Sequence, residues 1–175
     1  MKAKIIFLTF LIYLLYSCKD ITTIDDAKSL DCSEVKKLLT KEQKQEFLVA
    51  IWERDQSVRN SENKTYSGKS MNEIDALNLK KIECYLNNFK YPDTSWGLKS
   101  NLAPWVVIHH STNNARRRNF NYLRKAYNGG NLEVGHFVFY LDRLHSIEKG
   151  KRFDMGSSYR EEDRVEQLIK ILNLE

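Results

Sequence analysis

The chain has 175 residues, of which 42% are hydrophobic and 29% charged, a balance that fits one globular domain and excludes disorder throughout. The formal net charge is +5. Lys2 and Lys4 supply two of those charges and lie in a stretch, residues 1–17, that contains no acid, so the remainder has 26 basic against 23 acidic residues. This excess is too small to indicate nucleic-acid binding, and we expect no nucleic-acid partner.

The first 17 residues have the pattern of an export signal. Lys2 and Lys4 precede an apolar segment, residues 5–15, in which only Thr9 is polar. Those 11 residues are too few to span a membrane, which takes about 20 apolar residues. The pattern predicts a signal peptide over residues 1–17.

The end of that segment, Leu15-Tyr16-Ser17-Cys18, resembles a bacterial lipoprotein box, in which the cysteine is acylated and becomes the new N-terminus. The resemblance implies a lipid anchor at Cys18 and a place in the bacterial cell envelope, most simply at the outer membrane, on its periplasmic or surface face. Residues 18–30 are polar, and we expect them to be a flexible tether. An ordinary secretory signal cut elsewhere is the alternative.

Two further cysteines, Cys32 and Cys84, follow the tether. Outside the cytoplasm they could form a disulfide. Two small buried thiols are an equally good interpretation, and the sequence does not choose between them.

Residues 31–175 read as one all-α domain of about five or six helices. Thr40-x-x-Gln43 forms a capping box before Phe47, Leu48, Ile51 and Trp52, which mark one helical face. Residues 60–69 read as a loop. A second capping box, Ser70-x-x-Glu73, opens a helix that ends before Pro92.

Local signals conflict over residues 104–111, the densest apolar run outside the leader. Val106, Val107 and Ile108 favour a strand, whereas Pro104 suits the first turn of a helix. We expect a helix at the centre of a small bundle, in which tertiary packing overrides the preference of the β-branched residues.

Three more helices are expected after residue 111. Asn113 or Asn114 would cap a basic helix that stops at Gly129-Gly130. A helix over residues 133–148 would close at Gly150, and Ser158-x-x-Glu161 would cap a final amphipathic helix. The run Arg116-Arg117-Arg118 reads as a solvated helix face.

Several short motifs occur in order along the domain. They are Asp55-Gln56-x-x-Arg59, Asp75-x-x-Asn78, His110 at the end of the apolar run, Leu123-x-x-Ala126-Tyr127-x-x-Gly130, Tyr140-x-Asp142-Arg143 and Gly150-Lys151. Together they resemble a family of helical bacterial proteins, domain of unknown function 6624, whose activity is not known.

The chain departs from that family at two places. After Gly150-Lys151 the family continues as Pro-Gln-x-Tyr-Gly-Thr-Gln, where residues 152–158 here read Arg-Phe-Asp-Met-Gly-Ser-Ser. His109 stands where the family often has glutamine. The resemblance implies an all-α fold and specifies no reaction.

A second resemblance involves the same region. If residues 106–111 and 136–141 were strands, they would form a βαβ unit like the start of a zinc-dependent N-acetylmuramoyl-alanine amidase, which cuts peptidoglycan. Catalytic zinc needs about three protein ligands, and beyond residue 141 only His145 is available. His136 and His145 are nine residues apart on one expected helix, which makes them a poor metal pair. This alternative is the less favoured, and we expect no metal and no other cofactor.

Eight polar residues lie on or beside apolar helix faces and form the candidate site: Asp55, Gln56, Arg59, Asp75, Asn78, His110, Asp142 and Arg143. The first interpretation is a satisfied buried network, with Asp55 paired to Arg59, and Asp142 or Asp75 paired to Arg143. The domain would then bind or scaffold, with an unknown protein or small anionic molecule as its partner.

The second interpretation of these residues is a metal-independent hydrolase or lyase. His110 would act as the base, Asp142 or Asp75 would orient it, and Arg59 and Arg143 would neutralise developing charge. No specific catalytic motif accompanies the set, so no catalytic residue is assigned from the sequence.

Overall fold

The computed structural model describes residues 32–62, 64–154 and 161–175. In these ranges the chain forms seven α-helices and a small two-stranded sheet, which confirms the predicted all-α fold. The helices are α2 (Ser33–Lys36), α3 (Lys41–Asn60), α4 (Met71–Asn88), α5 (Leu98–His110), α6 (Asn113–Asn128), α7 (Val134–Lys149) and α8 (Glu161–Ile171). A 3-10 turn, η1 (Thr94–Trp96), and the strands β1 (Thr65–Tyr66) and β2 (Lys69–Ser70) complete the described elements. The leader with Cys18, the tether and the Ser158 capping box lie outside the described residues.

Two helices begin at the capping boxes that the sequence predicts. Thr40 accepts a hydrogen bond from the backbone N–H of Gln43, whose side chain accepts one from the backbone of Thr40 in return. Ser70 and Glu73 make the same reciprocal contacts at the start of α4. Because each box satisfies two N–H groups that the helix leaves unpaired, it contributes about 1 kcal/mol and fixes the helix start.

The segment expected to be a loop before α4 contains a short hairpin instead. Thr65 pairs with Ser70 and Tyr66 with Lys69 in an antiparallel register. Ser67 and Gly68 both have positive φ, 49° and 75°, as a two-residue type I′ turn requires. The Ser-Gly pair was therefore the turn signal.

α5 is the most deeply buried element among the described helices. All ten residues from Ser100 through His109 are buried, as expected of a helix that is packed on every side. The helix begins at Leu98, earlier than Pro104 suggests, with Gly97 (φ 82°) as its N-cap. Pro104 therefore lies inside the helix. Asn101, in the first turn, is buried, and its Nδ2 donates to the carbonyls of Pro92 and Asn131, both at 2.9 Å.

The later helices follow the expected pattern with one change. Thr112, and not Asn113 or Asn114, caps α6 by accepting from the backbone N–H of Ala115. α7 ends at Gly150, which takes the left-handed conformation as expected.

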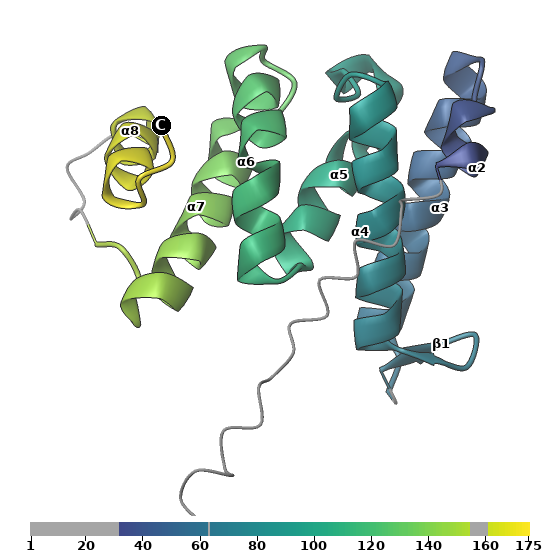
Figure 1. Cartoon of the computed structure of the whole chain (residues 1–175), viewed down its shortest axis with the longest axis horizontal. Helices are drawn as coiled ribbons and strands as arrows, with labels where there is room; N and C mark the ends of the chain where they lie inside the picture. Colours follow the sequence, from purple (N-terminus) through teal and green to yellow (C-terminus); the bar gives the residue numbers. More distant parts are fainter. Residues whose placement is uncertain (1–31, 63, 155–160) are drawn as a thin grey trace, which may run out of the picture. The chain divides into compact units, whose positions relative to one another are not determined.

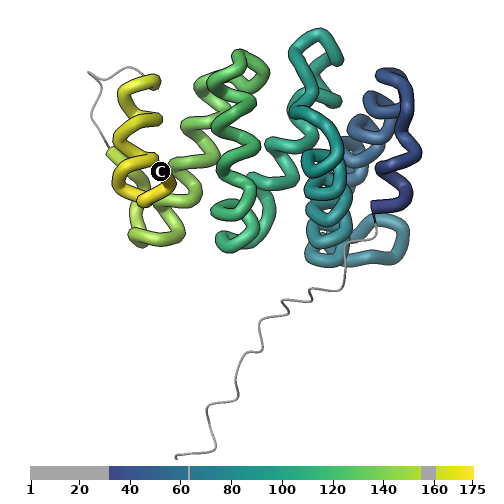
Figure 2. Tube along the Cα trace, turned by 45° about the horizontal axis from the view of Figure 1, so that its top comes forward, coloured from purple at the N-terminus to yellow at the C-terminus, as the bar shows by residue number. Residues whose placement is uncertain are grey.

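The helices α2 to α8 lie side by side in the order in which they occur along the chain (Figures 1 and 2). α3 packs against both α4 and α5, α5 continues to α6, α6 packs on α7, and α7 on α8. A hydrophobic core runs through all of them. Within the described ranges, every helix is too short or too polar to cross a membrane.

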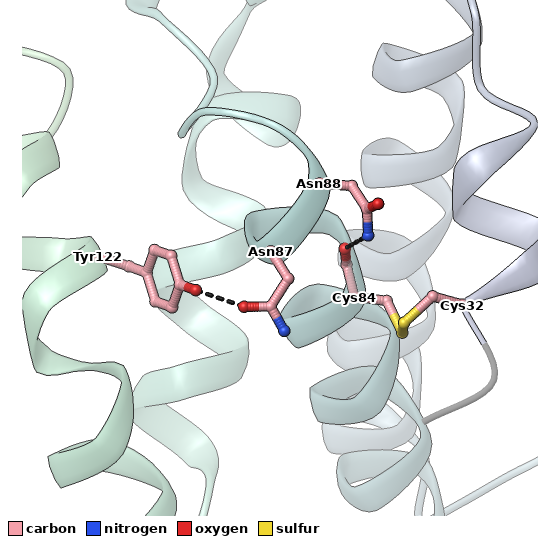
Figure 3. The surroundings of a disulfide bond; sticks show 5 residues. All are labelled: Cys32, Cys84, Asn87, Asn88 and Tyr122. Carbon is pink, nitrogen blue, oxygen red and sulfur yellow. Dashed lines mark hydrogen bonds between the residues drawn. A yellow bond between two sulfur atoms is a disulfide. The ribbon is translucent and has the colours of Figure 1, made fainter. Parts of the chain in front are cut away.

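A disulfide joins Cys32 to Cys84, with their Cα atoms 5.4 Å apart (Figure 3). It decides between the two interpretations of these cysteines in favour of pairing. It attaches the segment before α2 to the last turns of α4. One turn later Asn88 Nδ2 donates to the Cys84 carbonyl at 2.8 Å, and the Tyr122 hydroxyl of α6 donates to Asn87 Oδ1.

Candidate functional site

Asp55 is the centre of the polar residues that the fold brings together. The apolar stripe of α3 carries Leu48 and Ile51 into the core, and the same face one turn later carries Asp55, which is 1% exposed. Its carboxylate accepts hydrogen bonds from Gln56 Nε2 at 2.8 Å and from Arg59 Nη2 at 3.1 Å. A carboxylate that has lost its water is thus compensated by donors of its own helix.

Arg59 links three helices through this point. Its Nη2 contacts Asp55 of α3 at 3.1 Å and Asp75 of α4 at 2.7 Å. Its Nε lies 2.7 Å from Nδ1 of His110, the last residue of α5. We call Asp55, Gln56, Arg59, Asp75 and His110 the Asp55 cluster.

The Asp55 cluster is closed at its base and open at its rim. The side chains of Arg59, Asp75 and His110 are 20%, 20% and 21% exposed, against 1% for Asp55. Solvent therefore reaches the outer three groups, while the carboxylate that holds them is sealed beneath.

The two carboxylates of the cluster differ in their acidity. Burial favours the neutral form of Asp55, but the hydrogen bond and charge of His110, together with Arg59, outweigh it and lower the pKa of Asp55. Burial raises the pKa of Asp75, and the nearby charge of Asp55 adds to the effect, while Arg59 opposes it. Asp55 therefore keeps its charge, and Asp75 takes up a proton more readily.

His110 has two partners at one nitrogen. Nδ1 lies 3.1 and 3.2 Å from the two oxygens of Asp55 and 2.7 Å from Nε of Arg59. Since the Nε–H of an arginine can only donate, neutral His110 accepts from Arg59 at Nδ1, and protonated His110 donates from Nδ1 to Asp55. In both states Nδ1 is engaged within the cluster, and Nε2 is the nitrogen left for other partners.

Three of the eight candidate residues do not join the cluster. Asn78 is buried in α4, and its Oδ1 accepts from Arg54 at 3.1 Å. Asp142 pairs with Arg164 of α8 at 2.6 Å. Arg143 is exposed on α7.

Of the expected ion pairs, only that of Asp55 with Arg59 is confirmed. The pairing of Asp142 or Asp75 with Arg143 is wrong, because Arg164 and Arg59 take those carboxylates. Arg164 lies 22 residues after Asp142, in α8, and no local spacing pointed to it.

His109, for which the sequence predicts no role, is buried beside the cluster, next to His110. It is 2% exposed and stacks on Trp105 and Phe139, with ring centroids 5.2 and 4.6 Å away. Burial, reinforced by surrounding positive charges, Arg143 first among them, lowers the pKa of His109 to about 3. His109 is therefore a neutral core residue; its i, i+4 spacing from Trp105 was the available signal.

The arginine run is a solvated face only in part: the side chains of Arg117 and Arg118 are 38% and 51% exposed, whereas Arg116 is buried. Arg116 is 3% exposed and donates from Nε to the His109 carbonyl at 3.0 Å; burial lowers its pKa to about 10. Arg117 binds both oxygens of Glu148 at 2.7 Å, and Arg118 binds Glu83 at 2.7 Å. The three arginines thus connect α6 to α5, α7 and α4.

The strands that the amidase resemblance requires are absent: residues 106–110 belong to α5 and residues 136–141 to α7. His136 is half-buried and lies edge-on to Trp105, whereas His145 is buried with Nδ1 3.1 Å from the Lys151 carbonyl. In the described part of the chain, no group of three or more His, Cys, Asp or Glu side chains is arranged to hold a metal ion.

The fold and site define a small helical domain whose first three long helices are joined by a charged cluster. No protein-family model matches the chain, and comparisons with curated proteins and with solved structures give no match.

Proposed function

We propose that the protein is a lipid-anchored, non-catalytic binding domain of the bacterial cell envelope, in which the Asp55 cluster holds helices together. The observation that carries this proposal is the internal pairing of the cluster. Arg59 is shared between Asp55 and Asp75, and His110 Nδ1 faces Asp55. A guanidinium already bound to two carboxylates has little attraction left for an anionic substrate.

The location in the envelope is supported by the disulfide. Cys32 and Cys84 form it at the point where the predicted tether meets the helical domain. Structural disulfides persist in exported proteins and are rare in the cytoplasm. The predicted signal peptide and the lipid anchor at Cys18 agree with such a compartment.

One observation favours a second function, acid–base catalysis. A buried Asp55 holds Nδ1 of a partly exposed His110, an arrangement that fixes an imidazole and leaves Nε2 to exchange a proton. Asp75, with its raised pKa, would be a second proton carrier. Asp55 would thus take the orienting role that was predicted for Asp142 or Asp75.

One set of variants separates the two functions. We expect Asp55→Asn to lower the free energy of unfolding by about 2 kcal/mol, because Arg59 and His110 lose a buried partner. His110→Asn should lower it less, since that side chain is partly exposed. The purified wild-type chain should not turn over nitrophenyl esters, phosphates or glycosides, or peptidoglycan.

Asp142→Asn is the control, because it removes an ion-paired carboxylate outside the cluster whose exposure, 20%, is close to the 21% of His110. The catalytic function would replace the binding function if the wild type turns over one of these substrates and three conditions hold. The turnover disappears in His110→Asn, it persists in Asp142→Asn, and unfolding does not explain its loss.

A further inference from the structure

A groove separate from the Asp55 cluster lies among the end of α4, the segment that follows it, η1 and α6. It has a volume of about 930 Å³, within the range of small-molecule sites. Lys44 of α3 borders it, and so do Tyr122 and Lys125 of α6. The residues that line the groove range from Lys44 to Asn131 in the sequence, so only the folded chain brings them together.

Aromatic rings form much of the groove. Tyr85 is fully buried and packs on Phe89, with ring centroids 5.3 Å apart. Phe89, Tyr91, Trp96 and Tyr122 also line it, and each is half-buried. Aromatic rings with one wet edge offer flat apolar faces to a ligand.

Positive charge surrounds these rings. Lys44, Lys90 and Lys125 line the groove, and among the described residues none of the three forms an ion pair with a carboxylate. Lys44 Nζ lies 4.1 Å from the Phe89 ring centroid, so aromatic surface and charge meet at one point.

Among the described residues that line the groove, Asp93 has the single acidic side chain. It accepts a hydrogen bond from the backbone N–H of Ser95 at 2.8 Å. Its carboxylate is therefore occupied as the cap of η1, and the lining carries three positive charges against one negative charge.

We propose that this groove binds an acidic glycan of a few sugar rings. The flat apolar faces of sugar rings would stack on the aromatic side chains, and carboxylates on the sugars would meet the three lysines. The proposal rests on the proposed binding function and names the class of ligand; the charge complementarity of the groove carries it.

The test is calorimetric titration of the full chain, purified in detergent, with tetragalacturonate as the probe. We expect binding that weakens as salt is raised. The triple variant Lys44→Gln/Lys90→Gln/Lys125→Gln should lose at least tenfold in affinity. Trp96→Ala should lose a comparable factor, because it removes a stacking face and keeps the charge.

The matched control is Lys69→Gln/Lys149→Gln/Lys170→Gln, which removes the same charge at exposed positions outside the groove. It should bind like the wild type, and all variants should melt near the wild-type temperature. If the control variant lost as much affinity for tetragalacturonate as the groove variant, the net charge of the protein would explain the effect, and the proposal would be overturned.

Two other probes complete the test. A neutral tetrasaccharide, maltotetraose, and an acidic peptide, tetraglutamate, should bind at least tenfold more weakly. Absence of tetragalacturonate binding, or equal binding of either probe, overturns the acidic-glycan groove. The non-catalytic function is judged separately by the Asp55 and His110 variants, which lie outside this groove.

Discussion

At the residue scale, His109 and His110 are neighbours in sequence with opposite surroundings. His110 is 21% exposed and engages Asp55 and Arg59, while His109 is 2% exposed between aromatic rings. Successive helical residues point about 100° apart, so one faces the polar rim and the other the core. Their difference comes from position on α5, since both have the same chemistry.

This contrast predicts a pH dependence of stability. The pKa of His109 is about 3 when folded, against 6.5 ordinarily, so between these values the unfolded chain binds a proton that the folded chain does not. The contribution of neutral His109 to the free energy of unfolding is therefore fully present above pH 6.5 and is lost as the pH falls. Near pH 3 the loss is on the order of 4 kcal/mol.

Denaturant unfolding of the wild type, His109→Gln and His109→Leu at pH 7, 6, 5 and 4 checks this prediction. Both variants lack the proton site, so the difference between wild type and variant should change by about 2 kcal/mol between pH 7 and pH 5. Stability curves that stay parallel over this range would contradict the assignment.

Contacts of the candidate site could be predicted from the sequence only where the two partners are close along the chain. Asp55 and Arg59 are one turn apart, and helical spacing alone predicted their pair. The contacts of Arg59 with Asp75 and His110 join three helices. The motifs contained these residues, but the partner predicted for Asp75, Arg143, was wrong. Arg164 forms an ion pair with Asp142, 22 residues away in the sequence. The packing of α8 on α7 determines this pair, and no local sequence pattern indicates it.

At the element scale, capping chemistry was a better guide than residue preference. The boxes at Thr40 and Ser70 located two helix starts because they act within one turn. For α5 the intrinsic preference of the β-branched residues favoured a strand. The segment is a helix packed on every side, as predicted, so its tertiary contacts outweigh that preference. The hairpin at residues 65–70 was missed because its two-residue strands are exposed and have no apolar alternation.

The disulfide gives a prediction about the N-terminal element. Cys32 and Cys84 are 52 residues apart, and closing a loop of that size in the unfolded chain is worth about 4 kcal/mol. We expect Cys32→Ser/Cys84→Ser to lower the free energy of unfolding by roughly 2 to 4 kcal/mol.

Denaturant unfolding of the wild type with and without reductant checks the disulfide prediction. Reduction should reproduce the loss in the wild type and leave the double variant unchanged. An equal response of both proteins to reductant would show that the bond does not contribute.

At the scale of the whole molecule, the disulfide connects the predicted anchor to the fold. A pull on the tether reaches residue 32, and the bond at Cys32 passes it directly to α4, bypassing the four-residue helix α2. The arrangement suits a binding domain held at a surface.

The anchor itself is a prediction of the sequence, because the lipoprotein box ends at Cys18. Cells that express the chain and are fed a palmitate analogue should label it, and Cys18→Ala should abolish labelling and release the protein from the membrane fraction. Cys32→Ser is the matched control: it removes a cysteine that forms the disulfide, so labelling should persist. Two or three acyl chains hold a domain firmly, because each buried methylene contributes about 0.8 kcal/mol. Label retained in Cys18→Ala would place the lipid elsewhere and remove the basis for the tether.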